Sequence, residues 1–186
     1  KVCITAQHRE MLDQVLNFFA IKSDFDLNLM KPNQNLYSLT SEIIIKLKPI
    51  LELFGPDFIF VHGDTTTAMA ASIAGFYSGA KVCHIEAGLR TFDMSSPFPE
   101  EMNRSIISVT SSFHFAPTLT SKNNLLMENK KEEDIIVTGN TVIDSLLYSV
   151  DRVKSNFDDP EINFLKDKIN TQKKIILVTG HRRENH

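Results

Sequence analysis

Short apolar runs alternate along the chain with longer stretches in which apolar residues recur every three or four positions. Short runs rich in β-branched and aromatic residues are typical of buried strands, and the longer spacing is typical of amphipathic helices. The alternation predicts an α/β fold, a Rossmann-like parallel sheet with helices on both faces. The predicted strands are residues 2–5, 26–30, 58–61, 82–85, 113–116 and 135–137.

The helical spacing predicts helices at residues 11–19, 38–54, 66–77, 121–128 and 141–153. Pro49 lies inside the second of these and is expected to kink or break it, because proline removes an intrahelical donor. Gly55 and Pro56 are expected to end that helix.

The pattern changes after the last of these helices. Residues 158–173 are charged and contain Pro160, which indicates an interdomain linker with a helical piece. Residues 174–178 then predict a strand with no helix after it, and one strand does not complete a domain. We therefore expect an N-terminal domain at residues 1–157, and the first strand and turn of a truncated C-terminal domain at residues 174–186.

Composition narrows the classes of function. Twenty basic and twenty-three acidic residues give a net charge of −3, which offers no general field for nucleic acid or an anionic membrane. The apolar runs are far shorter than the roughly 20 residues of a membrane span. Cys3 and Cys83 lie in apolar runs and are expected to be buried, reduced thiols, which favours a cytoplasmic protein.

Neither a metal nor a cofactor is expected. The histidines and the two cysteines lack the spacing of a metal site, and no glycine fingerprint for a nicotinamide cofactor is present.

Polar residues gather directly after the predicted strands. In a parallel sheet the carboxyl ends of the strands share one edge, where loops and helix N-termini converge and ligands bind. We therefore expect the functional site along this edge. The polar clusters are residues 7–10, 62–67, 84–90, 138–141 and 179–184.

The cluster at residues 62–67 joins a predicted strand to a predicted helix, and two roles fit it. Asp64 or Thr65 would cap the helix by accepting hydrogen bonds from its free N–H groups. Free backbone donors and hydroxyls at a helix N-terminus also suit a phosphate or a sugar hydroxyl. Both roles hold together if Thr65 or Thr66 is the cap and Asp64 faces the ligand.

Glu86 comes directly after an apolar strand, so its carboxylate at the edge of a dry core needs a partner or a function. Arg90 is the structural alternative, as an ion-pair partner. Glu100 and Glu101 lie in a first helical turn, where one can stabilise the helix dipole and leave the other for chemistry.

Histidines follow or end three of the predicted strands. His181 and Arg182 follow a strand and a glycine, where a hydrogen-bonding, cationic pair would suit a diphosphate; a solvated loop is the alternative. His62 and His84 precede their clusters, and strand alternation places them in the core or behind the site.

Six motifs in order along the chain resemble the non-hydrolysing bacterial UDP-N-acetylglucosamine 2-epimerases. The resemblance implies one half of a glycosyltransferase-B type fold, with substrate in the cleft between two Rossmann-like domains. It also implies that the N-terminal domain lacks its first strand in this chain. It also implies reversible conversion of UDP-GlcNAc to UDP-ManNAc at C2, by elimination and re-addition of UDP, for surface polysaccharide synthesis. The motifs are residues 6–12, 61–67, 84–90, 97–104, 138–144 and 179–184.

The resemblance also assigns residues. Asp64, Glu86, Glu100 and His181 match catalytic positions, and Asp64, Glu86, His181 and Arg182 match substrate-contacting ones. Gln7 and Glu10 fall where the family binds a second, regulatory UDP-GlcNAc, and the whole protein is expected to be a homodimer.

Two other functions fit the same residues. One is an inactive remnant or weak nucleotide-sugar binder. The other is a hydrolysing UDP-GlcNAc 2-epimerase or a glycosyltransferase of the same fold. The motif set favours the non-hydrolysing epimerase, and we expect the 186-residue chain alone to be inactive.

Overall fold

A computed structural model describes residues 1–6, 9–29, 34–155, 157–170 and 172–178. The chain divides into two compact units, residues 1–141 and 142–186. In the part of the chain so described, none of the helices combines the length and hydropathy that a bilayer crossing needs. The same residues contain no group of three or more metal-binding side chains.

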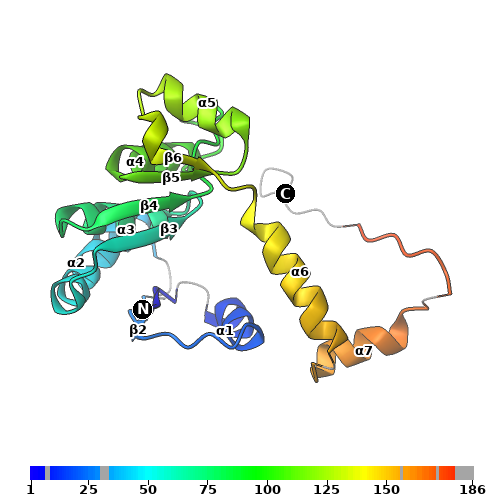
Figure 1. The fold of residues 1–186 in the computed structure, drawn as a ribbon. Helices are drawn as coiled ribbons and strands as arrows, with labels where there is room; N and C mark the ends of the chain where they lie inside the picture. Colours follow the sequence, from blue (N-terminus) through cyan, green and yellow to red (C-terminus); the bar gives the residue numbers. More distant parts are fainter. Residues whose placement is uncertain (7–8, 30–33, 156, 171, 179–186) are drawn as a thin grey trace. The chain divides into compact units, whose positions relative to one another are not determined.

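The first unit alternates strands and helices, as the sequence pattern predicts (Figure 1). Five of the six strands predicted before residue 141 form within one residue at each end, whereas the strand predicted at residues 26–30 is shorter and shifted, as β2. Its elements are β1 (Cys3–Ile4), α1 (Arg9–Phe18), β2 (Phe25–Asp26), α2 (Leu36–Phe54), β3 (Phe58–His62), α3 (Thr66–Tyr77), β4 (Lys81–Ile85), α4 (Glu100–Thr110), β5 (Phe113–Ala116), α5 (Leu119–Met127), η1 (Glu132–Asp134) and β6 (Ile135–Val137).

Four strands form a parallel sheet in the order β3-β4-β5-β6. His84 of β4 is in register with Val61 of β3 and with His114 of β5. Because all four strands run the same way, the residues that follow β3 and β4 emerge at one edge. This edge carries Asp64 and Glu86.

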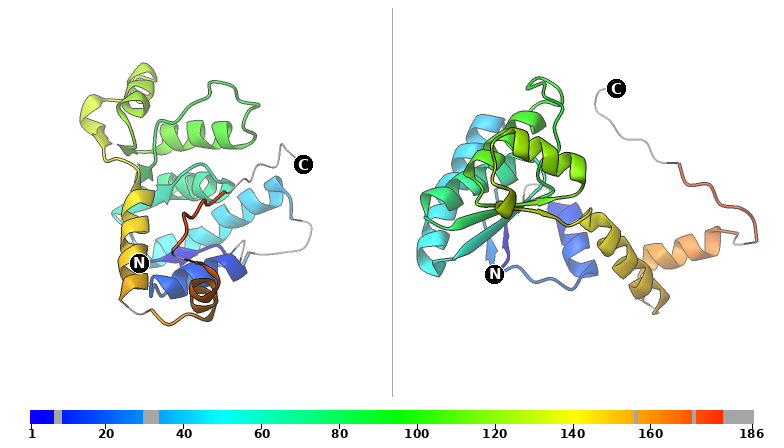
Figure 2. Two further views of the ribbon diagram at one scale, coloured as in Figure 1. Left: turned by 90° about the vertical axis from the view of Figure 1, so that its right-hand side faces the viewer. Right: turned by 45° about the horizontal axis from the view of Figure 1, so that its top comes forward.

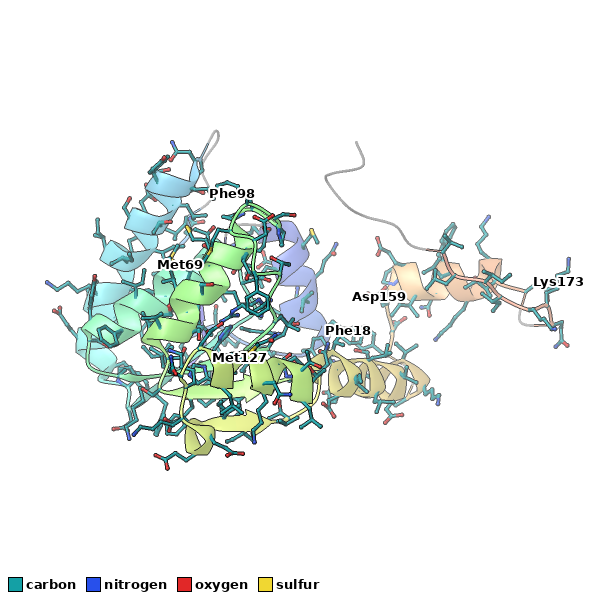
Figure 3. The ribbon with its side chains drawn as sticks, turned by 90° about the horizontal axis from the view of Figure 1, so that it is seen from above. Phe18, Met69, Phe98, Met127, Asp159 and Lys173 are labelled. Atoms are coloured by element: carbon teal, nitrogen blue, oxygen red, sulfur yellow. The ribbon has the colours of Figure 1, made fainter. Side chains whose placement is uncertain are left out.

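One face of this sheet carries the core. Val61 of β3 and Val82 of β4 pack against Met69 of α3 and Ile107 of α4, so the two helices lie side by side over these strands (Figures 2 and 3). Further along, Leu125 of α5 packs over β5 and β6. On the opposite face, Phe58 and Phe60 remain 48% and 62% exposed.

Helix α2 runs unbroken through Pro49, contrary to the expected break. Buried apolar residues four apart, Leu39, Ile43, Leu47 and Leu51, lie on both sides of the proline. Packing of this stripe maintains the helix across the missing hydrogen bond. The helix ends as expected at Gly55, whose N–H donates to the carbonyl of Leu51 at 2.8 Å.

The parallel strands separate into two sheets, because β1 pairs only with β2. A groove of about 840 Å³ lies between β1 and the outer edge of β3, and Cys3, Thr5 and Phe60 are among the residues that line it. Cys3 is therefore exposed, and the expectation that it is buried is wrong, whereas Cys83 is buried as expected.

The second unit contains α6 (Thr141–Lys154) and α7 (Pro160–Lys168), which are yellow and orange in Figure 1. Asp159 caps α7 by accepting from the N–H groups of Glu161 and Ile162. The predicted strand at residues 174–178 is not formed. A strand needs a neighbour for its backbone groups, and Ile176 and Leu177 are 86% and 88% exposed in the described residues.

Gly79 and Gly88 have similar backbone angles but different surroundings. Alanine at each position therefore tests how tightly the chain is packed around Gly88, two residues after Glu86. Gly79 and Gly88 have φ of +82° and +84°, but a Cβ at Gly79 meets nothing within 4 Å, whereas one at Gly88 lies 2.2 Å from the carbonyl oxygen of Ser121. We predict that Gly79→Ala lowers the free energy of unfolding by about 1–2 kcal/mol through the left-handed backbone alone. Gly88→Ala is expected to remove about 1–3 kcal/mol more through overpacking. Denaturant unfolding of both variants measures the difference, and equal losses would contradict this packing.

Candidate active site

Asp64 is placed by a tight turn after β3. Gly63 adopts φ +73° and donates its N–H to the carbonyl of Ile85 at 3.0 Å, which ties the turn to the end of β4. Thr65 then caps α3 by accepting from the N–H of Ala68 at 3.1 Å. Thr65 is thus one of the expected caps, and Asp64 is left to face the site edge.

Glu86 emerges directly after β4 in a left-handed conformation, with φ +67°. A non-glycine residue in this region carries strain of about 1–2 kcal/mol. Two contacts support it: Arg104 Nη1 donates to the Glu86 carbonyl at 2.5 Å, and the next residue, Ala87, donates to the carbonyl of Phe115 at 3.0 Å. Strain maintained in this way is typical of functional positions.

Arg104 joins the two carboxylates. Its side chain extends from α4, is 5% exposed, and donates Nη2 both to Asp64 Oδ2 and to Glu86 Oε2, the latter at 3.3 Å. The Asp64 and Glu86 side chains remain 30% and 27% exposed. The guanidinium is therefore buried behind two carboxylates that still reach solvent.

Asn103, the neighbour of Arg104, completes this arrangement. It is 1% exposed and donates Nδ2 to the Asp64 carbonyl at 2.8 Å. Sequence reasoning assigned no role to Asn103 or Arg104, although both lie in the motif at residues 97–104. The signal available in the sequence was position alone: Arg104 lies one helical turn after Glu100 in the same motif.

Glu100 and Glu101 differ as the sequence allows. Glu101 is 4% exposed and accepts from the N–H groups of Thr91 and Phe92 at 3.1 and 3.0 Å, so it anchors the loop before α4. Glu100 begins α4 and lies four residues before Arg104, on the same side of the helix. No hydrogen bond or ion pair in the described part of the chain joins Glu100 to Asp64 or Glu86.

Arg90 does not pair with Glu86, so that alternative is wrong. Its guanidinium, 2% exposed, forms two bonds to Glu128 of 2.5 and 2.9 Å, and Ser108 donates to the same carboxylate at 3.0 Å. Burial opposes the charge of Glu128, but the bonds from Arg90 outweigh it and lower the pKa of this carboxyl. The bidentate geometry satisfies Arg90 fully, which leaves Glu86 to Arg104.

Two buried histidines lie on the strands behind the site. His84 and His114 are 0% and 2% exposed. Burial lowers the pKa of His84 to about 3, with a further contribution from the charge of Arg104. Burial also lowers the pKa of His114 to about 4, with a further contribution from Lys130. His84 thus lies in the core as expected, whereas His62 is exposed, and the expectation for it is wrong.

Several expected site residues lie outside the described residues. These are Gln7, His181 and Arg182, and the side chain of Glu10, whose backbone belongs to α1.

Comparison with known proteins identifies the family of the chain. A family model for UDP-N-acetylglucosamine 2-epimerase matches residues 1–186. The chain belongs to the UDP-N-acetylglucosamine 2-epimerase family. A protein of that name from Salmonella borreze is 60% identical over 186 residues, which are 100% of this chain and 49% of that protein.

Solved structures of the epimerase family match the fold. The crystal structure of the Neisseria meningitidis UDP-GlcNAc 2-epimerase bound to UDP-GlcNAc has a TM-score of 0.91 and 56% identity, over 100% of this chain and 50% of that one. The Methanocaldococcus jannaschii enzyme in complex with UDP-GlcNAc and UDP has a TM-score of 0.77 and 31% identity, over 88% and 44%. The expected fold class, one half of a glycosyltransferase-B type structure, is confirmed. The chain spans about half the length of these relatives.

Because His84 and His114 are buried, we expect this epimerase-family chain to lose stability in mild acid. Unfolded His84 and His114 would bind protons below pH ~6.5, while the folded state excludes them until their lowered pKa values of about 3 and about 4. The free energy of unfolding is therefore highest above pH ~6.5, and it declines as the pH falls and the unfolded histidines take up protons. We predict a free energy of unfolding about 2.5 kcal/mol lower at pH 5.5 than at pH 7.5. Denaturant unfolding across this range measures it, and a constant value would contradict neutral burial.

Proposed function

We propose that the protein carrying this chain interconverts UDP-GlcNAc and UDP-ManNAc at C2 of the sugar. The observation that supports this most is the joining of Asp64 and Glu86 by the buried Arg104, at the carboxyl edge of the sheet in a chain of the epimerase family. Two carboxylates at one edge provide what proton removal on one face of a sugar carbon and proton return on the other require.

The reaction we propose passes through elimination and re-addition. A carboxylate removes the C2 proton, the C1–O bond to UDP breaks, and a C1–C2 double bond forms. UDP then re-adds at C1 while an acid returns a proton to the opposite face of C2. Asp64, Glu86 and Glu100 supply the base and the acid, and His181 with Arg182 stabilises the charge of the departing diphosphate.

Arg104 would help both steps without reacting. Its buried guanidinium donates to both the Asp64 and the Glu86 side chains and so holds the two carboxylates in place at the site edge. It also separates the two carboxylates, so that both can lie near one sugar ring without direct repulsion.

The proposed function also assigns roles to the second domain, the linker and the N-terminal residues. Residues 174–186 open a second domain whose uridine contacts complete the cleft, and residues 158–173 link the two. Gln7 and Glu10 receive a second, regulatory UDP-GlcNAc, and the whole protein forms a homodimer in the cytoplasm.

We also propose that a strand preceding residue 1 occupies the groove between β1 and β3. The groove of about 840 Å³ runs along all five residues of β3, and it has the apolar lining that a buried strand would need, including Ile59 and Val61. Such a strand would join the two parallel sheets into one.

Substitution of the three carboxylates tests the reaction. In the whole protein, Asp64→Asn, Glu86→Gln and Glu100→Gln are each expected to slow epimerisation by about 100-fold or more, because each removes one general acid or base. Glu133→Gln, at an exposed carboxylate on the sheet's far end, is the control and should leave turnover unchanged. Proton NMR in D2O follows both product and exchange at C2.

Two results of the same measurement would contradict the proposed reaction. A wild-type protein that never exchanges the C2 proton of UDP-GlcNAc, in the presence of product or without it, is not an epimerase of this type. Release of free ManNAc would instead support the hydrolysing alternative.

The 186-residue chain alone is predicted to be inactive. A cleft enzyme fixes its substrate from both walls, and positioning of the reacting groups contributes about 7–11 kcal/mol to lowering the barrier. Loss of the second wall and of its uridine contacts should abolish turnover and weaken UDP-GlcNAc binding measured by calorimetry. Turnover within about tenfold of the whole protein, a barrier difference of ~1.4 kcal/mol, would show that the second domain is dispensable.

A further inference from the structure

His84 reaches from the core into the turn that carries Asp64. It lies on β4, two residues before Glu86, and its side chain is fully buried on the face covered by α3 and α4. Its Nε2 lies 2.8 Å from the carbonyl oxygen of Gly63, and its Nδ1 has no hydrogen-bond partner among the residues that the structure describes.

The chemistry of this contact fixes the form of the ring. A carbonyl oxygen can only accept, so Nε2 must carry the proton and Nδ1 the lone pair. Burial is the main reason that the pKa of His84 falls to about 3, and nearby positive charge on Arg104 and Arg90 lowers it further, whereas the bond to Gly63 opposes the shift. The ring is therefore a neutral, permanent donor and is unsuited to exchanging protons with a substrate.

The bond restrains one peptide plane. The carbonyl of Gly63 and the N–H of Asp64 belong to the same rigid unit, so a donor on that carbonyl sets the direction in which the chain enters Asp64. Gly63 is also held through its N–H by Ile85, and a Cβ on Gly63 would lie 3.4 Å from Glu86 Oε2. The turn is thus packed directly against the second carboxylate.

We propose that His84 is a positioning residue: its Nε2–H orients the Gly63–Asp64 peptide and thereby aims the Asp64 carboxylate at Arg104 and the reacting carbon. The inference rests on the proposed function for its kinetic consequence, whereas its structural part concerns this turn alone. The other side-chain contacts of Asp64 in the described residues come after the peptide that it shares with Gly63. Asn103 donates to the Asp64 carbonyl, and Arg104 donates to its carboxylate.

A matched pair of substitutions separates donation from packing. His84→Gln keeps a donor at the Nε2 position, and His84→Met has a similar length without one. In the whole protein we expect His84→Met to lower kcat by about 10- to 100-fold with KM changed less than about threefold, because a small misplacement of a reacting group carries such a penalty. His84→Gln should restore kcat to within about fivefold of wild type.

His114 provides the control. It lies in register with His84 on the neighbouring strand, is equally buried and also has an unpartnered Nδ1. His114→Met and His114→Gln should lower the melting temperature about as much as the changes at His84 but alter kcat less than about threefold. Equal kcat losses from Met at 84 and 114, or from Met and Gln at 84, would overturn the proposal.

A second measurement does not depend on the reaction. Nitrogen-15 NMR of the histidine rings should show His84 as the Nε2–H tautomer at every pH from 5 to 9. A crystal structure of His84→Met should show Asp64 Oδ2 displaced from Arg104. A ring protonated at Nδ1, or an undisturbed Asp64, would refute the positioning role even if the protein catalyses another reaction.

Discussion

The arrangement of the site edge depends on one buried charge. The guanidinium of Arg104 has little access to water and would be strongly destabilising without acidic partners. Asp64 and Glu86 are those partners, so the ends of β3 and β4 and the first turns of α4 must come together for the domain to fold well. Folding and the placement of these two carboxylates are therefore coupled through the same interaction.

A second layer behind this charge is polar but neutral. His84 and His114 occupy positions in the sheet where apolar residues would pack as well, and each leaves one ring nitrogen unsatisfied. Such a layer is less stable than an apolar one, and in His84 it places a fixed hydrogen-bond donor beneath the turn. Arg90 forms a separate ion pair with Glu128, which keeps the Arg90 guanidinium away from Glu86.

Local patterns predicted much of the fold, because strand runs, helical spacing and caps such as Thr65 depend on near neighbours. The alternative pairing of Glu86 with Arg90 is wrong because the choice between two arginines depends on how α4 and α5 pack, which sequence spacing does not reveal. The division into two sheets and the exposure of Cys3 depend on which strand edges meet. Arg104 was recognisable only as a charged residue in a motif, since its burial is a tertiary property.

The backbone and the side chain of Glu86 make opposite demands on the residue at this position. Its φ of +67° lies in a region that glycine enters freely, so the backbone alone favours a residue with no side chain. The buried Arg104 favours the carboxylate, because a glycine here would remove one of its two acidic partners. A laboratory selection for thermal tolerance would therefore act on position 86 in two directions at once, and relief of backbone strain alone does not decide its outcome.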